Sequence, residues 1–543
     1  MNQENKGSHR VWKGALILTA AALLVKLMSA LYRLPYQNFA GDVGFYVYQQ
    51  VYPFYALAAA LGTTGFPIVV SKYMAEASGQ PKEKATVARH AGMALLLLCG
   101  FFFVGLFFFA DFLTAIMGDR HLTGLIRVAS AAYLFVPLVA LLRGTFQGNE
   151  ENMLPTALSQ IGEQTMRVCF ILGVSWYLFV THGDPYAFGF AATAGSAFAP
   201  LVSLVILMCF VPQKKAAVKR LLFSSDHSVR WRWVKKLMIS GCLFSVLAVP
   251  LLFFQLIDSL TVLRLLEQGQ VADARAVKGI YDRAYILTQF GMIAATSLTA
   301  AIVPRLSQLA VQRQHHDFRI EAALALKISL AFGAAAAAGL MSISREANIM
   351  LFRNANGTLA FALAALTMLT LSLMLTASGI WESAGKPWMP FFCLIVGASA
   401  KAAANVLLIP RFSIVGAALA TCTGTLIAAG LNVFYLQRAG LTRAFSWLML
   451  VKLASAIAGM TLSVFVWKQA MYRVTEPLAS RPAAAVCALS AAMIGGVVFV
   501  ALIWFFRFLD ARDLARIPFL ATLTKRRDRT EHDAEAAHRS SKL

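Results

Sequence analysis

The chain has 543 residues, of which 59% are hydrophobic and only 14% are charged, and its formal net charge is +23. A composition this apolar excludes a soluble globular protein, because a chain of this length could not keep so much apolar surface out of water. The apolar runs are about 20 residues long and do not alternate with polar residues, so they predict membrane-spanning helices and exclude a β-barrel.

Fourteen apolar stretches follow one another along the chain, each long enough to cross a bilayer as a helix. We predict spans at about 12–36, 45–71, 87–110, 122–146, 153–180, 187–211, 232–257, 279–304, 321–343, 357–380, 387–409, 413–436, 446–467 and 483–507. An even number of spans places both termini on one side. Lys and Arg gather in the termini and in the loops on that side, so the positive-inside rule predicts that both termini face the cytoplasm.

A pattern at the end of the fourth predicted span recurs at the end of the tenth. In 143–167 and in 379–405, a Gly-containing turn is followed by a Pro that opens the next helix and by a charged or amide residue about three turns later. This offset of six spans predicts two pseudo-symmetric six-helix lobes. The predicted fold is therefore an all-α polytopic membrane protein with lobes at 1–211 and 232–436, a basic cytoplasmic linker at 212–231, two extra helices within 437–509 and a cytoplasmic tail at 510–543.

The segment 212–236 is the most basic loop, and Leu, Phe and Trp are interleaved with its Lys and Arg residues. Such a segment is typical of a helix that lies on anionic lipid headgroups. Anionic membrane lipids are therefore expected partners, whereas nucleic acid is not.

The first predicted span carries two cations, Lys26 and Arg33, seven residues apart. Seven residues are about two helical turns, so both side chains lie on one face of the helix. A charge at the centre of a bilayer costs about 2.5–3.5 kcal/mol on insertion scales, so these cations are expected to face a hydrated interior. For Arg33, which is near the end of the helix, snorkelling to the headgroups is the alternative.

The eighth predicted span is less apolar than its neighbours, with Arg283, Thr288, Gln289 and Thr296 among its polar residues, and we expect it to line water or substrate. The alternative for Arg283 is a structural ion pair, with Asp258 or with the adjacent Asp282. Asp258, at the end of the seventh span, could pair with a central cation, bind a proton or sodium, or simply end its helix.

Two further groups of polar residues lie inside predicted spans. Glu163 and Arg167 have the favourable i,i+4 order, which predicts a structural ion pair packed between helices, with a proton relay as the alternative. Lys401 and Asn405 lie in the repeated pattern and are further candidates for the site.

The sequence contains no phosphate-binding loop, dinucleotide motif, metal-ligand spacing or nucleophile elbow. We therefore predict that the protein is not an enzyme, with no catalytic residues, bound metal or cofactor. The seven cysteines all fall inside predicted spans without paired spacing and are interpreted as packing residues. Energy for transport would come from a proton or sodium gradient, the membrane potential or the gradient of the substrate.

Several stretches together resemble a known family. They are KGALILTAAALLVKLMSALYR, GFPIVVSKYMAE, LLRGTFQGNEENMLPTALSQIGEQTMRV, GIYDRA, and GKPWMP followed by NVLLIP and VGAALAT. The chain resembles the polysaccharide-export branch of the multidrug/oligosaccharidyl-lipid/polysaccharide exporter superfamily, in particular its SpoVB/YabM-like bacterial membrane proteins, which are related to MurJ-type lipid II flippases.

The resemblance implies a fourteen-helix exporter in the bacterial cytoplasmic membrane. Its expected substrate is a lipid-linked, undecaprenyl-pyrophosphate type oligosaccharide or cell-envelope glycan precursor, which is translocated by alternating access. MurJ-type flippases place essential arginines in spans 1, 2 and 8, and here span 1 offers Lys26 and Arg33 and span 8 offers Arg283. Span 2 has no arginine at the matching place, so lipid II itself is not implied.

Together these considerations predict a central substrate cavity formed by Lys26, Arg33, Arg283 and Asp258, in a protein expected to be a monomer. A drug or metabolite antiporter of the same superfamily is the main alternative, but its cationic substrates would favour carboxylates at the cavity. A membrane-embedded glycan polymerase or ligase is less favoured, because the outer loops are short.

Overall fold

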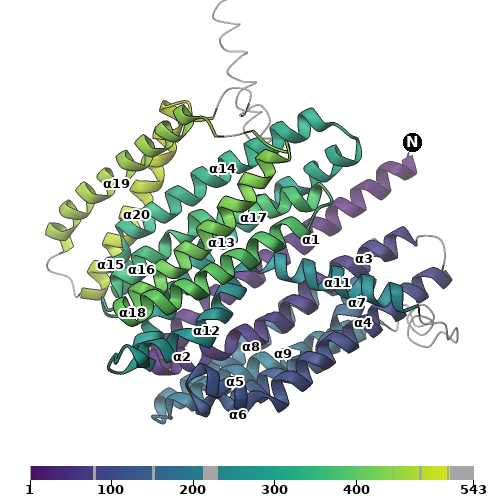
Figure 1. Ribbon diagram of the computed structural model, residues 1–543, viewed down its shortest axis with the longest axis horizontal. Helices are drawn as coiled ribbons and strands as arrows, with labels where there is room; N and C mark the ends of the chain where they lie inside the picture. Colours follow the sequence, from purple (N-terminus) through teal and green to yellow (C-terminus); the bar gives the residue numbers. More distant parts are fainter. Residues whose placement is uncertain are drawn as a thin grey trace, which may run out of the picture.

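The computed structural model describes residues 2–77, 81–148, 153–211, 230–443, 445–475, 480–509 and 513. These residues form helices joined by short turns, and no strand occurs among them (Figure 1). The expectation of an all-α membrane protein is thus confirmed by the many long, apolar helices. Each helix satisfies its own backbone hydrogen bonds, which the hydrocarbon core of a bilayer requires.

The first part of the chain forms the helices drawn in purple and blue in Figure 1. They are α1 (Asn2–Leu31), α2 (Arg33–Ala60), the π-helix η1 (Leu61–Gly65), α3 (Phe66–Glu76), α4 (Pro81–Phe108), α5 (Ala110–Met117), η2 (Arg120–Leu122), α6 (Thr123–Ser130), α7 (Ala132–Gly148), α8 (Leu154–Val180) and α9 (Pro185–Phe210). The connection between the first two predicted spans lies inside α2. There Gly41 has φ of +68°, a left-handed conformation that glycine adopts without steric strain, and the chain reverses at this residue.

The second part forms the teal, green and yellow helices. They are α11 (Trp231–Ala248), α12 (Pro250–Gln268), α13 (Ala274–Val311), α14 (His315–Ser342), α15 (Ser344–Phe352), α16 (Thr358–Ala365), α17 (Thr367–Ser383), α18 (Trp388–Arg438), α19 (Trp447–Thr475) and α20 (Ser480–Phe505). α11 and α12 meet at Val249 with a bend of 82°, and Pro250 begins the second helix of this pair.

Ten helical segments among the described residues are long and apolar enough to cross a membrane, or eleven if the bent α11–α12 pair is one span. Two of the ten contain a reversal, at Gly41 and at Ser413, so each covers two of the predicted spans. α8 also coincides with a predicted span. The helices follow the predicted positions, while the number fourteen stays a prediction.

The packing of α11 differs from what the predicted lobes imply. α11 was expected to begin the second lobe, but it packs against η1, α3 and α4 of the first. The contact is close: Gly65 in η1 faces the Ser245 side chain and the Gly241 carbonyl of α11. α12 instead packs mainly against α18 of the second lobe, and also against α2 and α5 of the first, so it lies between the two lobes.

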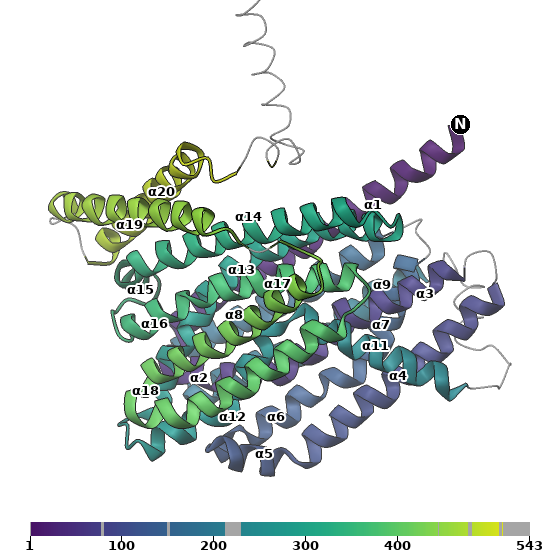
Figure 2. The same ribbon diagram turned by 45° about the horizontal axis from the view of Figure 1, so that its top comes forward.

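The last two helices, α19 and α20, pack on each other at the edge of the molecule, next to α14 and α15 (Figure 2). The basic segment 212–229 and the tail beyond residue 513 lie outside the described residues. The predictions of a lipid-bound linker and a cytoplasmic tail therefore stay predictions for those residues.

Candidate functional site

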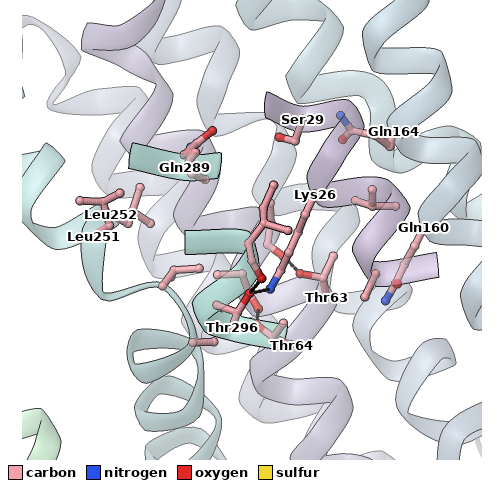
Figure 3. Close-up of a pocket in the computed structure, with 18 of the residues that line it drawn as sticks. Lys26, Ser29, Thr63, Thr64, Gln160, Gln164, Leu251, Leu252, Gln289 and Thr296 are labelled. Atoms are coloured by element: carbon pink, nitrogen blue, oxygen red, sulfur yellow. Dashed lines mark hydrogen bonds between the residues drawn. The ribbon is translucent and has the colours of Figure 1, made fainter. Parts of the chain in front are cut away.

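A cavity of about 530 Å³ lies between the two halves of the molecule. The first half contributes α1, α2, η1, α3, α7 and α8 to its walls, and the second half contributes the α11–α12 bend and α13. Helices from both halves are drawn around it in the close-up (Figure 3). A cavity at such an interface is where transporters of two repeated halves bind substrate.

Lys26 of α1 lies in this cavity, as the sequence predicted (Figure 3). Its side chain is exposed, and its Nζ donates a hydrogen bond of 2.9 Å to Thr296 Oγ1 on α13. The polar face predicted for the eighth span is also there, because Gln289 and Thr296 both line the cavity. Among the described residues, Lys26 makes no ion pair. Its charge is therefore available to an anion that enters.

Arg167 of α8 is the second cation of the cavity, although the sequence assigned it to an ion pair with Glu163. Its guanidinium donates to Tyr55 Oη at 3.0 Å and to Ser29 Oγ at 3.1 Å. The ring centroid of Tyr55 lies 5.5 Å from its Cζ atom, a distance that allows a cation–π interaction. These neighbours are uncharged, so they orient the guanidinium without neutralising it.

Glu163 also lines the cavity, but its ion pair is with Arg143 and not with Arg167. Arg143 Nη2 lies 2.8 Å from Glu163 Oε2, and the guanidinium also donates to Ser159, Ser203 and the carbonyl of Gly62. The prediction of an i,i+4 pair was wrong, because the spacing along one helix cannot reveal a stronger donor on a neighbouring helix. Arg143, which lies near the end of the fourth predicted span, is buried with 1% exposure.

Arg33 neither lines the cavity nor reaches toward a headgroup region. It is fully buried, and its Cζ atom lies 4.3 Å from the ring centroid of Tyr52, a residue that does line the cavity. Within the described part of the chain, none of its three guanidinium nitrogens has a hydrogen-bond acceptor. A buried charge without acceptors is costly, so the position of Arg33 costs free energy in this conformation.

Arg283 does not line the cavity. It lies at the end of the molecule where polar contacts join the two halves. Its guanidinium bonds to the carboxylate of Asp42 and donates to Asn354 Oδ1 at 2.7 Å. Both acids named as alternative partners have other neighbours, since Asp282 pairs with Lys278 at 2.5 Å and Asp258 pairs with Lys401. Arg283 therefore does form an ion pair, but its partner is Asp42 and neither of the two expected acids, and the pair joins the two lobes.

Further hydrogen bonds accompany this ion pair at the same end. Asn38 Nδ2 donates to the carbonyl of Leu351 at 3.0 Å, and Gln50 Nε2 donates to the carbonyl of Ser259 at 2.9 Å. Each bond joins α2 to an element of the second half. We call the Arg283–Asp42 and Asn38–Leu351 contacts the closure, because they join the two halves at this end.

Asp258, Lys401 and Asn405 come together, but in a buried cluster inside the second half and not at the cavity. Lys401 Nζ lies 2.8 Å from Asp258 Oδ2 and donates to the carbonyl of Phe254 at 2.8 Å. Asp258 also accepts hydrogen bonds from Tyr281, Tyr285 and Asn405. The expected contact of Asp258 with substrate is not present in this conformation. α12 links the two places, because Leu251, Leu252 and Gln255 of the same helix line the cavity.

The remaining walls are of two kinds. Amide and hydroxyl side chains gather in the cavity, namely Thr63, Thr64, Gln147, Gln160, Gln164, Gln255 and Gln289, and apolar residues such as Leu18, Ile68 and Leu252 form the rest. Of the amides, only Gln289 was singled out in the sequence. Gln160 and Gln164 could have been found, since they share a helical face with Glu163 and Arg167. No group of three or more potential metal ligands occurs among the described residues.

Comparison with known proteins gives a consistent result. The family described as "Polysaccharide biosynthesis protein" matches residues 11–310. The "Uncharacterized membrane protein YabM" of Bacillus subtilis (strain 168) is 36% identical over 97% of this chain and 98% of its own length. The "Lipid II flippase MurJ" of the same strain is 24% identical over 91% of this chain and 95% of its own length.

A solved structure of the lipid II flippase MurJ in an inward closed conformation superposes with a TM-score of 0.66. It covers 92% of this chain and 100% of the solved chain, at 14% sequence identity, so the likeness establishes the fold alone. The resemblance recognised in the sequence is confirmed by these matches.

Proposed function

This chain belongs to the polysaccharide biosynthesis protein family, and we propose that it is a flippase or exporter that moves a lipid-linked oligosaccharide across the membrane. The proposed headgroup is an undecaprenyl-pyrophosphate type glycan precursor. The observation that carries the proposal is the composition of the cavity. Two cations, Lys26 and Arg167, stand there among amides and hydroxyls and pair with no carboxylate of the described residues.

The charge of the cavity favours an anionic group. Glu163 is the acidic residue among the lining residues, and the buried guanidinium of Arg143 neutralises it. Arg167 can offer two parallel N–H donors to a phosphate, and Lys26 adds a compact point charge. A pyrophosphate can accept both donors of Arg167 and also interact with the charge of Lys26.

The uncharged walls suit the rest of such a molecule. Glutamine amides both donate and accept hydrogen bonds, so the amide-rich wall can pair with sugar hydroxyl and acetamido groups. The apolar stretches of the same cavity, for example at Ile68 and Leu252, can lie against the first part of a polyprenyl chain. One cavity thus offers surfaces for each part of an amphipathic lipid.

Transport would proceed by alternating access. With both termini in the cytoplasm, as the charge distribution predicts, the closure would lie toward the outer leaflet and the cavity toward the inner one. Opening the closure would release Arg283 from Asp42, and it would bring Arg283 and the acceptor-poor Arg33 within reach of the anion. The predicted roles of Arg33, Arg283 and Asp258 therefore belong to a later step of the cycle.

The proposal can be tested by reconstitution. Purified protein in liposomes would be offered a panel of labelled undecaprenyl-pyrophosphate-linked sugars, with and without an imposed membrane potential or a proton or sodium gradient. We expect label to reach the opposite leaflet only with protein, and more slowly with Lys26→Gln. Movement of none of the substrates under any gradient would contradict the proposal.

A drug or metabolite antiporter remains the alternative, and one arm of the same assay addresses it. A free carboxylate in a largely apolar site would favour organic cations. The lining carboxylate of Glu163 is held by Arg143, so we expect no protein-dependent uptake of cationic dyes in exchange for protons.

A further inference from the structure

The last two helices make polar contacts with the short helix α15 at the edge of the second lobe. Lys468 of α19 forms an ion pair of 2.9 Å with Glu346 of α15, and its Nζ also donates to the carbonyl of Ser342 at 2.7 Å. Tyr472 Oη, one turn further along α19, donates to the same carboxylate. Arg481 of α20 donates to the carbonyl of Met350 at 3.0 Å. Both helices of the pair therefore hold α15.

The carboxylate of Glu346 that accepts these contacts is buried. Glu346 is 2% exposed, so its carboxylate is largely removed from solvent and depends on these donors. Burial acts to raise the pKa of Glu346, but hydrogen bonds from Tyr472 and Lys468 outweigh it, and the pKa lies below its ordinary value. A buried ionised pair of this kind fixes the relative position of the two helices that carry it.

The last residues of α15 and those directly after it form one side of the closure. Leu351 supplies the carbonyl that accepts from Asn38, and Asn354 supplies the oxygen that accepts from Arg283. The Phe352 ring between them lies with its centroid 5.1 Å from Arg283 Cζ. α15 is nine residues long, so its anchored and closing ends are about three turns apart at most.

We propose that α19 and α20 brace the closure: Lys468, Tyr472 and Arg481 are positioning residues that hold residues 344–354 where they can bond to Asn38 and Arg283. The two extra helices then set how readily the lobes separate at this end. Although its importance for transport rests on the proposed function, the brace itself can be tested without any substrate.

If Lys468, Tyr472 and Arg481 only stabilised their own surroundings, their loss would not affect residues 34–44, so this segment distinguishes the two roles. Lys468, Tyr472 and Arg481 make no hydrogen bond or ion pair to residues 34–44 within the described ranges, yet those residues form the opposite half of the closure. Loss of the brace should therefore loosen a segment that the mutated side chain does not contact.

Hydrogen–deuterium exchange on the full-length protein in nanodiscs tests this. In Lys468→Met, amides in 34–44 and 344–358 should exchange about fivefold faster, because weaker closure raises the population of open states. Lys468→Arg should restore slow exchange in both segments. Lys452→Met is the matched control, since Lys452 lies on the same helix but donates to the carbonyl of Arg507 at 3.3 Å, and it should leave both unchanged.

Faster exchange in Lys468→Met that is confined to 344–358 and α19 would overturn the proposal, because it would reduce the contact to local packing. Should Lys468→Met fail to fold, Tyr472→Phe removes one hydrogen bond to Glu346 and keeps the ion pair. It should still speed exchange in 34–44, and unchanged exchange there would overturn the proposal. Flipping by the wild type is measured separately, so failure of the proposed function would leave these results intact.

Discussion

Arg283 and Asp42, which are 241 residues apart in the chain, form an ion pair that joins the two lobes at the closed end of the molecule. Gln37 also donates to Asp42, at 2.9 Å, and Asn354 accepts from Arg283. The sequence predicted that Arg283 would be at the substrate site. In this conformation it is bonded to Asp42, and this ion pair would have to break before Arg283 could bind an anion.

Arg283→Ala is expected to abolish transport while leaving membrane insertion and folding intact. The variant loses charge-assisted hydrogen bonds worth about 1.5–3 kcal/mol each, so the closure should weaken by at least about tenfold. The measurement is flipping of a labelled undecaprenyl-linked sugar in liposomes, with size-exclusion chromatography as the check on folding. Asp42→Asn serves as the comparison, since it weakens the closure but keeps the arginine. Normal flipping by Arg283→Ala would remove this residue from the mechanism.

Lys26→Gln should slow flipping by about tenfold or more, because the cavity loses a charge-assisted hydrogen bond to the proposed pyrophosphate. Lys26→Arg keeps the charge and should retain most of the activity. Thr296→Val removes the present partner of Lys26 without changing the charge, and its rate should stay near that of the wild type. The three initial rates are measured with the same labelled substrate. Equal loss in Thr296→Val and Lys26→Gln would show that the cross-cavity hydrogen bond, and not the charge, is what matters.

Arg33→Met should make the protein more stable and less active. The guanidinium of Arg33 is buried without acceptors in the described structure, so an apolar side chain of similar length removes a desolvation penalty of about 1–3 kcal/mol. Flipping should fall, because the proposed later step loses a cation. Thermal unfolding in detergent and the liposome assay measure the two effects. A lower unfolding temperature would mean that Arg33 has a partner that stabilises the resting protein.

Lys401→Met should destabilise the protein by about 3–5 kcal/mol, because it leaves the carboxylate of Asp258 buried without its cation. The double variant Lys401→Met with Asp258→Asn removes both charges and should recover most of the loss. Chemical or thermal unfolding of the two variants and of Asp258→Asn alone forms a double-mutant cycle. Additive effects would contradict a direct pair. The same variants tested in a sodium gradient would show whether this cluster takes part in coupling.

The sequence predicted those features that depend on one helix at a time. Span positions follow from runs of apolar residues, and the inward face of Lys26 and the polar face around Gln289 and Thr296 follow from helical periodicity. Partners on other helices could not be predicted, because they depend on how the helices pack. For this reason the sequence did not predict that Glu163 pairs with Arg143 and not with Arg167, or that Arg283 pairs with Asp42. The expected gathering of Lys26, Arg33 and Arg283 around one cavity failed in this conformation for the same reason.

The bend at Val249 places a mechanical constraint on any motion of the lobes. α11 packs on the first lobe, whereas α12 packs mainly on α18 of the second lobe, and residues 248–250 between them belong to the cavity wall. If one lobe were to rotate against the other, the backbone torsions at this bend would have to change, since α11 and α12 are covalently joined there. Because the bend is itself part of the cavity wall, any change in its angle would also change the shape of the cavity.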